Sequence, residues 1–454
     1  MEQSKGYGGS KVTTGSIVSE DIDLFSMLDP DPIVKSGRTV TIRPLSENVQ
    51  GPFQFHLEPQ GSEHYLQLKS IRLTGLAQIR TMEDGVVPLS VNLSGVNLFP
   101  ASLFKAIEVY VNDTLITDLS SALSPYQNYI QTILSYNESA QKTHLRGQMF
   151  IMDEAFKFDN LKISSDNLVD DDEMSSVNQG FKKRSTFFRG SKPVDFYIPL
   201  SSDFLQSDRL LHPSASVKIR LLRNTDEFSI LSDSDQSFRV KMSNLRMHAH
   251  YVELHDAIVK KHNTMLLREP VVYPITRTVM REYNLASGIT SKYISQLFTG
   301  KLPKSIVIGM VSARSFHGDQ KLNPFNFQHY NVQEYSLKVN GEYIPGDSFK
   351  PDFDHDLYIR EYMELYRNIG IDVSEDHGNV VTPELFANGC FFMAYDLTGH
   401  RCNMLHKHTT IEGNVDLPLV FKKALPEEVI VIVYATFDAH VEVFHDRGVK
   451  VIFD

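Results

Sequence analysis

Four residues that can bind zinc lie close together near the end of the chain, in the stretch GHRCNMLHKH. They are His400, Cys402, His406 and His408. Imidazole and thiolate are ligands that zinc prefers, but structural zinc sites usually take two pairs of ligands separated by a longer loop. The crowded spacing favours an ordinary polar loop, and whether a metal occupies these residues is left open.

An acidic stretch resembles the start of a calcium-binding loop. Asp352–Asp356, DFDHD, places carboxylates at alternate positions. Such a loop needs Gly for its sharp turn and a bidentate Glu at its end, but Leu357 and Met363 stand at those positions. We therefore predict a polar loop that leads into a helix.

The sequence contains no motif for covalent or phosphate chemistry. A Ser on a strand-to-helix elbow and a Gly-rich loop with Lys and Ser/Thr at their required spacing are both absent from it. His248, His250 and His255 fall at alternate or near-alternate positions of a predicted strand, as histidines at strand edges or interfaces do. No catalytic, cofactor-binding or metal-binding residue is nominated, and we do not expect an enzyme.

The net charge of −11 argues against a protein that wraps nucleic acid, because phosphate binding needs clustered Lys and Arg. The best local basic stretch is FKKRSTFFRGSK, Phe181–Lys192, which follows an acidic run at 170–173. We predict that this stretch is an exposed polar loop and expect no sequence-specific binding of nucleic acid.

Composition is that of a folded protein with large cores. The chain has 454 residues, of which 41% are hydrophobic, and only two cysteines, Cys390 and Cys402. Two thiols cannot hold such a chain together, so burial must stabilise it and a reduced compartment is expected. No run of about 18 apolar residues occurs, and the first residues are polar, so we expect synthesis in the cytosol without a secretory route.

Short β-prone segments separated by Gly, Pro, Asn and Asp dominate the chain. They include PFQFHLE, HYLQLKSIRLTGLAQIRT, AIEVYVN, SVKIRLLR and FRVKMSNLRMHAHYVEL. Many short strands with frequent turn signals predict an all-β sandwich or barrel.

Two hairpins resemble each other across some two hundred residues. The segment Asn323–Pro345 has the pattern of two strands joined at Asn340 and Gly341. In Ala106–Asp118, an alternation of apolar and polar residues is again broken by Asn and a turn residue. Asn-Gly between alternating apolar residues predicts a tight two-residue turn.

Each hairpin is followed by a predicted helix with a Tyr-rich apolar face. The first is expected to start with Ser124 as its cap and Pro125 in its first turn, and to end near Asn137. The second is expected to be capped by Asp356 and to end at Gly370.

Two later pairs of segments also match. VDFYIPL at Val194–Leu200 resembles VDLPLVF at Val415–Phe421, and AHYVELHD at Ala249–Asp256 resembles AHVEVFHD at Ala439–Asp446. Three pairs in the same order indicate a divergent tandem duplication.

The duplication predicts three regions: a flexible N-terminal arm at 1–38, a first barrel at 39–265 and a second at 266–454. The first copy carries surplus residues at Asn137–Lys192. Because loops tolerate insertions and strands do not, we expect this surplus to be a surface loop.

Collinear blocks after the arm resemble the major capsid proteins of Polinton (Maverick) elements and adintoviruses. The blocks in the first half include SLFKAIEVYVNDTLI, PYQNYIQTILSYNESAQKTHL and SDRLLHPSASVKIRLLR. Those in the second half include YPITRTVMREYNL, LYIREYMELYRNIGI and ALPEEVIVIVYATFD, together with the long block from LPKSIVIGMV to KVNGEYIP. The resemblance covers nearly the whole chain after the arm.

The resemblance implies a fold and a role. It implies two tandem eight-stranded jelly rolls, a double jelly roll, with a few short helices in loops. It also implies a structural protein of the virion that forms homotrimers, the pseudo-hexagonal capsomers of an icosahedral capsid, as in virophages and the adenovirus lineage. Neighbouring capsomers, a single jelly-roll penton protein and minor capsid proteins are the partners it implies. No cofactor is implied, and contact with an internal membrane is left open.

Two alternatives are kept. The chain could be a host-domesticated relative that no longer builds virions. A carbohydrate-binding or hydrolytic β-sandwich is the other, but the chain has no Trp, and stacking on sugars favours large aromatic platforms.

Overall fold

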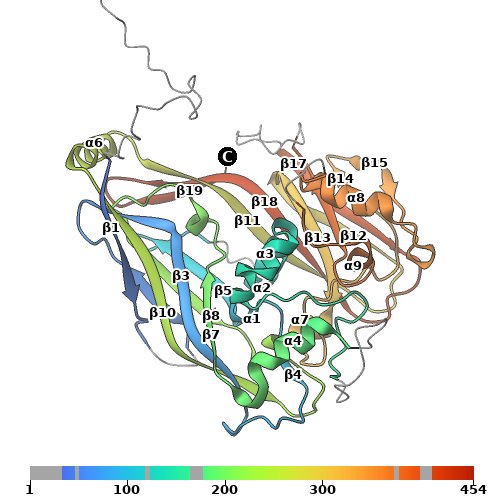
Figure 1. Ribbon diagram of the computed structural model, residues 1–454. Coiled ribbons are helices and arrows are strands. Elements are labelled where there is room, and N and C mark those ends of the chain that lie inside the picture. The colour runs from blue at the N-terminus through green and yellow to red at the C-terminus, as the bar shows by residue number, and fades with distance from the viewer. Residues whose placement is uncertain are drawn as a thin grey trace, which may run out of the picture.

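The computed structural model describes residues 33–46, 51–117, 123–163, 177–372, 378–398 and 412–453. In Figure 1 the two halves of the chain lie side by side, with α1, α2 and α3 between them. Of the predicted arm at 1–38, only the last residues are described, and 34–38 already belong to the first strand.

The first half of the chain forms two four-stranded antiparallel sheets, named here sheet 1A and sheet 1B. Sheet 1A has the order β1 (Val34–Ile42), β10 (Phe238–Leu254), β3 (His64–Thr81), β7 (Val194–Pro199). Sheet 1B has the order β2 (Phe53–Leu57), β8 (Val217–Arg223), β5 (Phe104–Val111), β6 (Thr114–Leu115). A small extra pair is formed by β4 (Leu93–Gly95) and β9 (Ile230–Ser232).

The second half repeats this plan in sheets 2A and 2B. Sheet 2A has the order β11 (Val271–Leu285), β18 (Val429–Val443), β13 (Ser305–Ser312), β16 (Phe392–Asp396), and β19 (Val449–Phe453) also pairs with β18. Sheet 2B has the order β12 (Ser291–Lys301), β17 (Glu412–Phe421), β14 (Val332–Val339), β15 (Glu342–Phe349).

Counted within each half without the small pair and β19, the strand order is 1-8-3-6 in one sheet and 2-7-4-5 in the other. Both halves have this order. Two four-stranded sheets connected in this way are an eight-stranded jelly roll, so the predicted pair of tandem jelly rolls is confirmed.

The two tight turns are confirmed as equivalent. Asn340 and Gly341 have φ values of 52° and 93°, and Asn112 and Asp113 have 46° and 67°. Positive φ at both central residues is the two-residue turn that matches the twist of a hairpin. The Asn of each turn also accepts a hydrogen bond from the seventh strand of its barrel or from the residue just before that strand. Asn112 Oδ1 accepts from Ser216 N at 2.9 Å, and Asn340 Oδ1 accepts from Asn414 N at 2.9 Å.

One of the three predicted segment pairs is wrong. Val194–Leu200 contains β7, the sixth strand of its barrel, whereas Val415–Phe421 lies in β17, the seventh. The true counterpart of β17 is β8, and that of β7 is β16. The pairing of Ala249–Asp256 with Ala439–Asp446 is confirmed, because both end the eighth strand.

The helix after the first hairpin, α2 (Ser124–Ser135), ends near Asn137 as predicted but differs from its prediction at the start. Leu123 is its N-cap and no side chain caps it, so Ser124 is already helical. The helix stops before Asn137 because Tyr136 is extended, and Asn137 Oδ1 instead caps α3 (Glu138–Lys142) by accepting from Ala140 N at 2.9 Å.

The second predicted helix, α8 (Ile359–Asn368), starts later than expected. Asp356 lies in the left-handed region and does not cap it. The predicted end is confirmed: Gly370 has φ 78°, and its N–H donates to Arg367 O at 3.1 Å.

The surplus at Asn137–Lys192 is not simply a surface loop. It contains α4 (Gln179–Phe188), in which Phe181, Arg184 and Phe188 are buried. These three residues are spaced i, i+3 and i+7, so they share one helix face. The prediction that Phe181–Lys192 is an exposed polar loop is therefore wrong.

The remaining helices are short, apart from α6 (Asp256–Leu266), which spans the predicted boundary near residue 265. They are α1 (Phe99–Ser102), η1 (His144–Gln148), η2 (Arg189–Ser191), η3 (Phe204–Gln206), α5 (Asp226–Ser229), α7 (Ala313–His317), η4 (Phe353–His355) and α9 (Pro383–Ala387). Among the described residues, no helix is long and apolar enough to cross a membrane.

Candidate assembly interfaces

The acidic loop is neutralised by a lysine from another strand end. Lys422 Nζ lies 3.0 Å from Asp352 Oδ1 and 2.9 Å from Asp354 Oδ2. The contact with Lys422 lowers the pKa of Asp354, and contacts with His355 and then Lys422 lower that of Asp352. The loop forms η4 before α8, so the prediction of a polar loop leading to a helix is confirmed.

The strand histidines His248 and His250 lie on β10, which is an interior strand of sheet 1A and not an edge strand. His248 Nδ1 is 3.1 Å from Thr41 Oγ1 and its Nε2 is 3.0 Å from Thr74 Oγ1, while His250 Nδ1 is 3.1 Å from Thr39 Oγ1. These rings join three strands by hydrogen bonds. His255 is separate from them, at the N-cap of α6.

The zinc-like cluster His400, Cys402, His406 and His408 lies outside the described residues. Within the described ranges, no three or more His, Cys, Asp or Glu residues come together as metal ligands would. Cys390 is fully buried, and burial raises the pKa of its thiol.

A buried ion pair fastens the surplus segment. Asp153 and Arg184 are each 1% exposed, and Arg184 Nη2 donates to both carboxylate oxygens at 2.8 and 3.0 Å. Arg184 Nε also donates to Gly95 O at 3.2 Å, so its charge is well bonded. Asn323, from the second half, donates through Nδ2 to Asp153 Oδ2 at 3.1 Å. The cluster thus connects both halves of the chain.

Sequence reasoning missed this cluster because its members come from distant segments. A usable signal is Gly180, where a Cβ atom would lie 2.3 Å from Met152 O and 2.8 Å from Asp153 Oδ1. Only a residue without a side chain lets α4 approach so closely. A Gly at the start of a helix that also carries an inward Arg is therefore informative.

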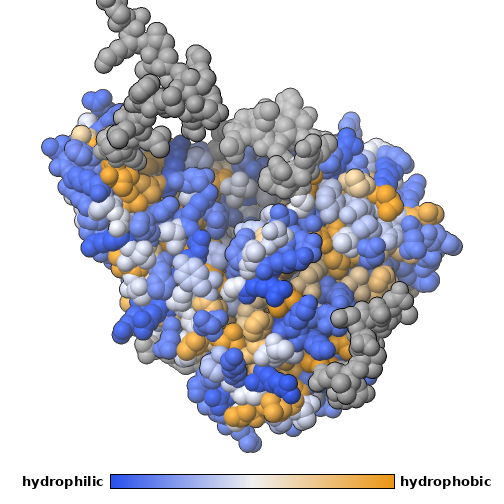
Figure 2. Space-filling view, viewed as in Figure 1, coloured by the Kyte–Doolittle hydropathy of each residue, from blue (hydrophilic) through white to orange (hydrophobic). Residues whose placement is uncertain are grey.

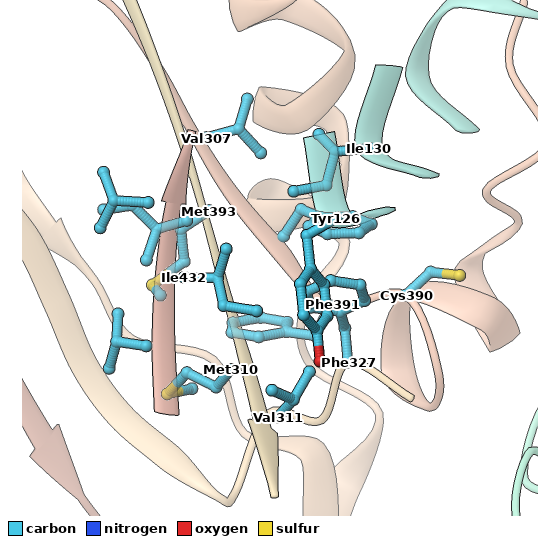
Figure 3. Packing of buried hydrophobic residues seen from close by; sticks show 14 of the residues in the cluster. Tyr126, Ile130, Val307, Met310, Val311, Phe327, Cys390, Phe391, Met393 and Ile432 are labelled. Carbon is cyan, nitrogen blue, oxygen red and sulfur yellow. The ribbon is translucent and has the colours of Figure 1, made fainter. Parts of the chain in front are cut away.

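The aromatic face of α2 packs on the second barrel. Tyr129 stacks on Phe325 with ring centroids 4.2 Å apart and planes 4° apart, and Tyr126 contacts Phe325 and Phe327 edge to face. Figure 3 shows Tyr126 and Ile130 pointing toward the strands that carry Val307 and Ile432. The apolar core of the second barrel therefore extends into helix α2 of the first half.

In sheet 2A the strands β13, β16 and most of β18 are buried on both faces, which is not the case for the strands of sheet 1A. Nearly every residue of β13, β16 and β18 up to 437 is buried, and their sequences SIVIGMVS, FMAYD and VIVIVYATF are almost continuously apolar. In β3 and β10, buried residues mostly alternate with partly exposed polar ones. One face of sheet 1A is thus open to solvent in the single chain.

A polar cleft of about 890 Å³ lies between the surplus segment and the second barrel. Its two carboxylates are bonded within the protein: Asp159 accepts from Asn323 N at 2.6 Å and from Asn326 Nδ2 at 2.6 Å, and Glu427 accepts from Tyr330 Oη at 3.1 Å. Burial raises the pKa of Asp159. The polar groups of this cleft hold the two halves together.

Among the exposed apolar side chains, two groups lie close together in the sequence. One group lies in the connection from β3 to β4 and comprises Met82, Val86 and Leu89. Figure 2 shows apolar surface at the lower end of the molecule, where Figure 1 places β4. The other lies at the start of α8 and comprises Leu357, Ile359 and Met363. Exposed apolar groups of this kind are typical of surfaces that meet another protein.

Comparison with known proteins identifies the fold. No family model matches the chain. An uncharacterized protein of Caenorhabditis elegans is 22% identical over 406 residues, which is 86% of this chain and 90% of that protein.

Solved structures with the same fold come from viruses. A chain of the Sputnik virophage matches with a TM-score of 0.61 and 12% identity, over 97% of this chain and 93% of its own. The Faustovirus major capsid protein matches with a TM-score of 0.52 and 7% identity, over 95% and 92%. The mavirus major capsid protein matches with a TM-score of 0.50 and 11% identity, over 100% and 96%. The fold of this chain is a double jelly roll.

Proposed function

We propose that this protein is a viral major capsid protein that works by self-association and not by catalysis. The observation that carries the proposal is the repeated strand order, two complete jelly rolls in one chain, together with end-to-end coverage of capsid proteins of the same fold. The charged groups that could suggest chemistry, such as Asp352, Asp354 and Asp159, are engaged in contacts within the protein.

Three chains are proposed to form one pseudo-hexagonal capsomer. Each subunit contributes two similar barrels, so a threefold ring presents six similar footprints and can tile an icosahedral shell. Neighbouring capsomers, a single jelly-roll penton protein and minor capsid proteins are the proposed partners, and the virion shell is the proposed location. The division near residue 265 and an N-terminal arm that ends before β1, and not at residue 38, belong to the same proposal.

The sequence blocks that resemble Polinton and adintovirus proteins support a more specific origin. We propose that this chain is a major capsid protein of the Polinton or adintovirus kind. The similarity to a nematode protein over most of both chains favours a second candidate, a capsid-derived protein kept by an animal host that no longer builds virions.

Expression of the full chain followed by mass photometry and negative-stain electron microscopy tests the proposal. A capsid function predicts that the protein forms trimers. It also predicts that closed shells form when the partner proteins are added. Trimers that never form shells with any partner would favour the host-kept protein. A chain that remains monomeric at every concentration would refute both.

A further inference from the structure

The two barrels differ in how their first strand is covered. β1 and β11 are equivalent: each is the first strand of its barrel, lies at the edge of its sheet, and pairs along one side with the eighth strand. Seven of the nine residues of β1 are exposed, against four of the fifteen residues of β11. The same edge is therefore covered in the second barrel and open in the first.

The cover on β11 comes from the first barrel. Asp203 Oδ2 accepts from Thr278 N at 2.6 Å, and its Oδ1 accepts from the Thr278 hydroxyl at 3.0 Å. Arg209 Nη1 donates to Val272 O at 2.5 Å. Both residues belong to the connection between β7 and β8, so one jelly roll satisfies the edge backbone of the other.

Aromatic packing extends this contact. The ring of Phe204 packs edge to face on Tyr273 with centroids 5.7 Å apart, and the Tyr273 hydroxyl accepts from His212 N at 2.9 Å. Tyr273 is 0% exposed and belongs to the apolar core of the first barrel. The edge of β11 thus forms a hydrogen-bonded and partly buried interface between the barrels.

The edge of β1 has no such cover among the described residues. Its sheet pairing is with β10 alone, so along the other side its backbone groups meet no strand of the described ranges. An unpaired strand edge is a template for another chain, and proteins usually protect it. The residues around it are polar: Thr39 and Thr41 on β1, and His248 and His250 on β10.

We propose that a second copy of this chain occupies the β1 edge, and that it does so with its second barrel, as the first barrel occupies β11 within each chain. This inference rests on the proposed function and names the surface through which the copies meet. Because the donor barrel and the acceptor edge differ, the contact is head to tail, and such contacts close into a ring when the rotation allows. Each copy in the ring then has both β1 and β11 covered.

The experiment compares two pairs of charge substitutions in the full chain. T39E with T41E places two carboxylates along β1, and S291E with K292E does the same on β12, another edge strand with an exposed end. Mass photometry over a dilution series gives the dissociation constant of the oligomer. We expect the β1 pair of substitutions to raise the dissociation constant at least about tenfold and the β12 pair to leave it unchanged.

Hydrogen exchange gives the second readout, which a fold defect would not reproduce. In the assembled wild type, amides of 34–42 should exchange more slowly than in the dissociated wild type. Thermal unfolding of the dissociated variants checks that they are folded.

Each failure has a distinct meaning. A wild type that never associates overturns the proposed function and this inference together. A wild type that associates while the β1 pair associates equally well, or while 34–42 gains no protection, overturns the inference alone. Protection of 34–42 that disappears when residues 2–32 are deleted, with the oligomer intact, also overturns it, because the N-terminal segment would then be the cover.

Discussion

At the scale of single residues, the charged pair Asp153 and Arg184 shows how polar chemistry is used in this molecule. Both side chains are almost completely enclosed, and their hydrogen bonds join them to the surplus segment, to β4 and to Asn323. Desolvation of both charges is costly, so the pair is best understood as fixing one arrangement of the segment against the second barrel.

The substitution R184M should destabilise the protein strongly. It leaves the Asp153 carboxylate buried without its cation, and breaking a buried pair in this way costs about 3–5 kcal/mol. Chemical denaturation measures the loss. K142M is the matched control, because Lys142 and its partner Glu138 have side chains 66% and 74% exposed, and we expect a change under about 0.5 kcal/mol. Equal effects of the two variants would contradict the enclosed role of Arg184.

The buried imidazole of His329 should make the stability of the folded protein depend on pH. Its ring stacks on Phe353 with centroids 3.8 Å apart, and burial lowers its pKa to about 4 from an ordinary value of 6.5, with Asp354 opposing the shift. As the pH falls, the His329 imidazole therefore binds a proton near pH 6.5 in the unfolded chain but only near pH 4 in the folded chain. The stability contribution is complete above pH 6.5 and is lost as the pH falls toward 4.

The variant H329Q should remove this part of the pH dependence. The free energy of unfolding of the wild type, relative to H329Q, should fall by at most about 3 kcal/mol between pH 7 and pH 4. A flat difference between the wild type and H329Q would show that burial does not lower the pKa of His329 in the folded protein.

At the scale of elements, local turn chemistry was predictable and strand identity was not. Asn340 and Gly341 predict a tight hairpin turn because few other residue types adopt positive φ easily. The match between VDFYIPL and VDLPLVF failed because many strands of the two barrels alternate apolar and polar residues, so similar patterns recur in strands of different rank. Strand rank depends on pairing between distant segments, which a short pattern does not encode.

Helix α4 illustrates the opposite error. The charged residues of Phe181–Lys192 dominated the prediction of an exposed loop, while the i, i+3, i+7 spacing of Phe181, Arg184 and Phe188 carried the correct signal. The unbroken apolar runs of β13 and β18 were likewise a sign that sheet 2A is covered on both faces. The elements that cover it lie far away in the sequence.

Gly341 gives a direct test of the turn. G341A places a Cβ on a residue with φ 93°, where nothing else lies within 4 Å of the new atom, so the cost is backbone strain of about 1–2 kcal/mol. G346A, in β15, also meets nothing within 4 Å and has no positive φ, so it should be neutral within about 0.5 kcal/mol. Thermal or chemical unfolding compares them, and a neutral G341A would argue against the left-handed turn.

At the scale of the whole molecule, the two barrels are coupled and not merely linked. The core of the second barrel includes Tyr126, Tyr129 and Phe158 from the first half, and the core of the first includes Tyr273 and Val441 from the second. Each jelly roll therefore completes the other, which agrees with the proposal that further copies continue the same kind of contact.

Residues 266–454 expressed alone should not form a well-packed domain. Without α2 and the surplus segment, the outer face of sheet 2A loses its apolar cover. We expect strong binding of a hydrophobic dye and no cooperative unfolding, whereas co-expression with residues 1–265 should restore both properties to those of the full chain. Cooperative unfolding of 266–454 alone, without dye binding, would contradict the coupling.

The central claim is that this double jelly roll acts by assembling with copies of itself. Electron microscopy of the purified full-length chain, with mass photometry of the same sample, tests it most directly. We predict particles with threefold symmetry and a six-lobed outline, at three times the 51.6 kDa mass of one chain. Single 51.6 kDa particles that persist as the concentration is raised would contradict the account.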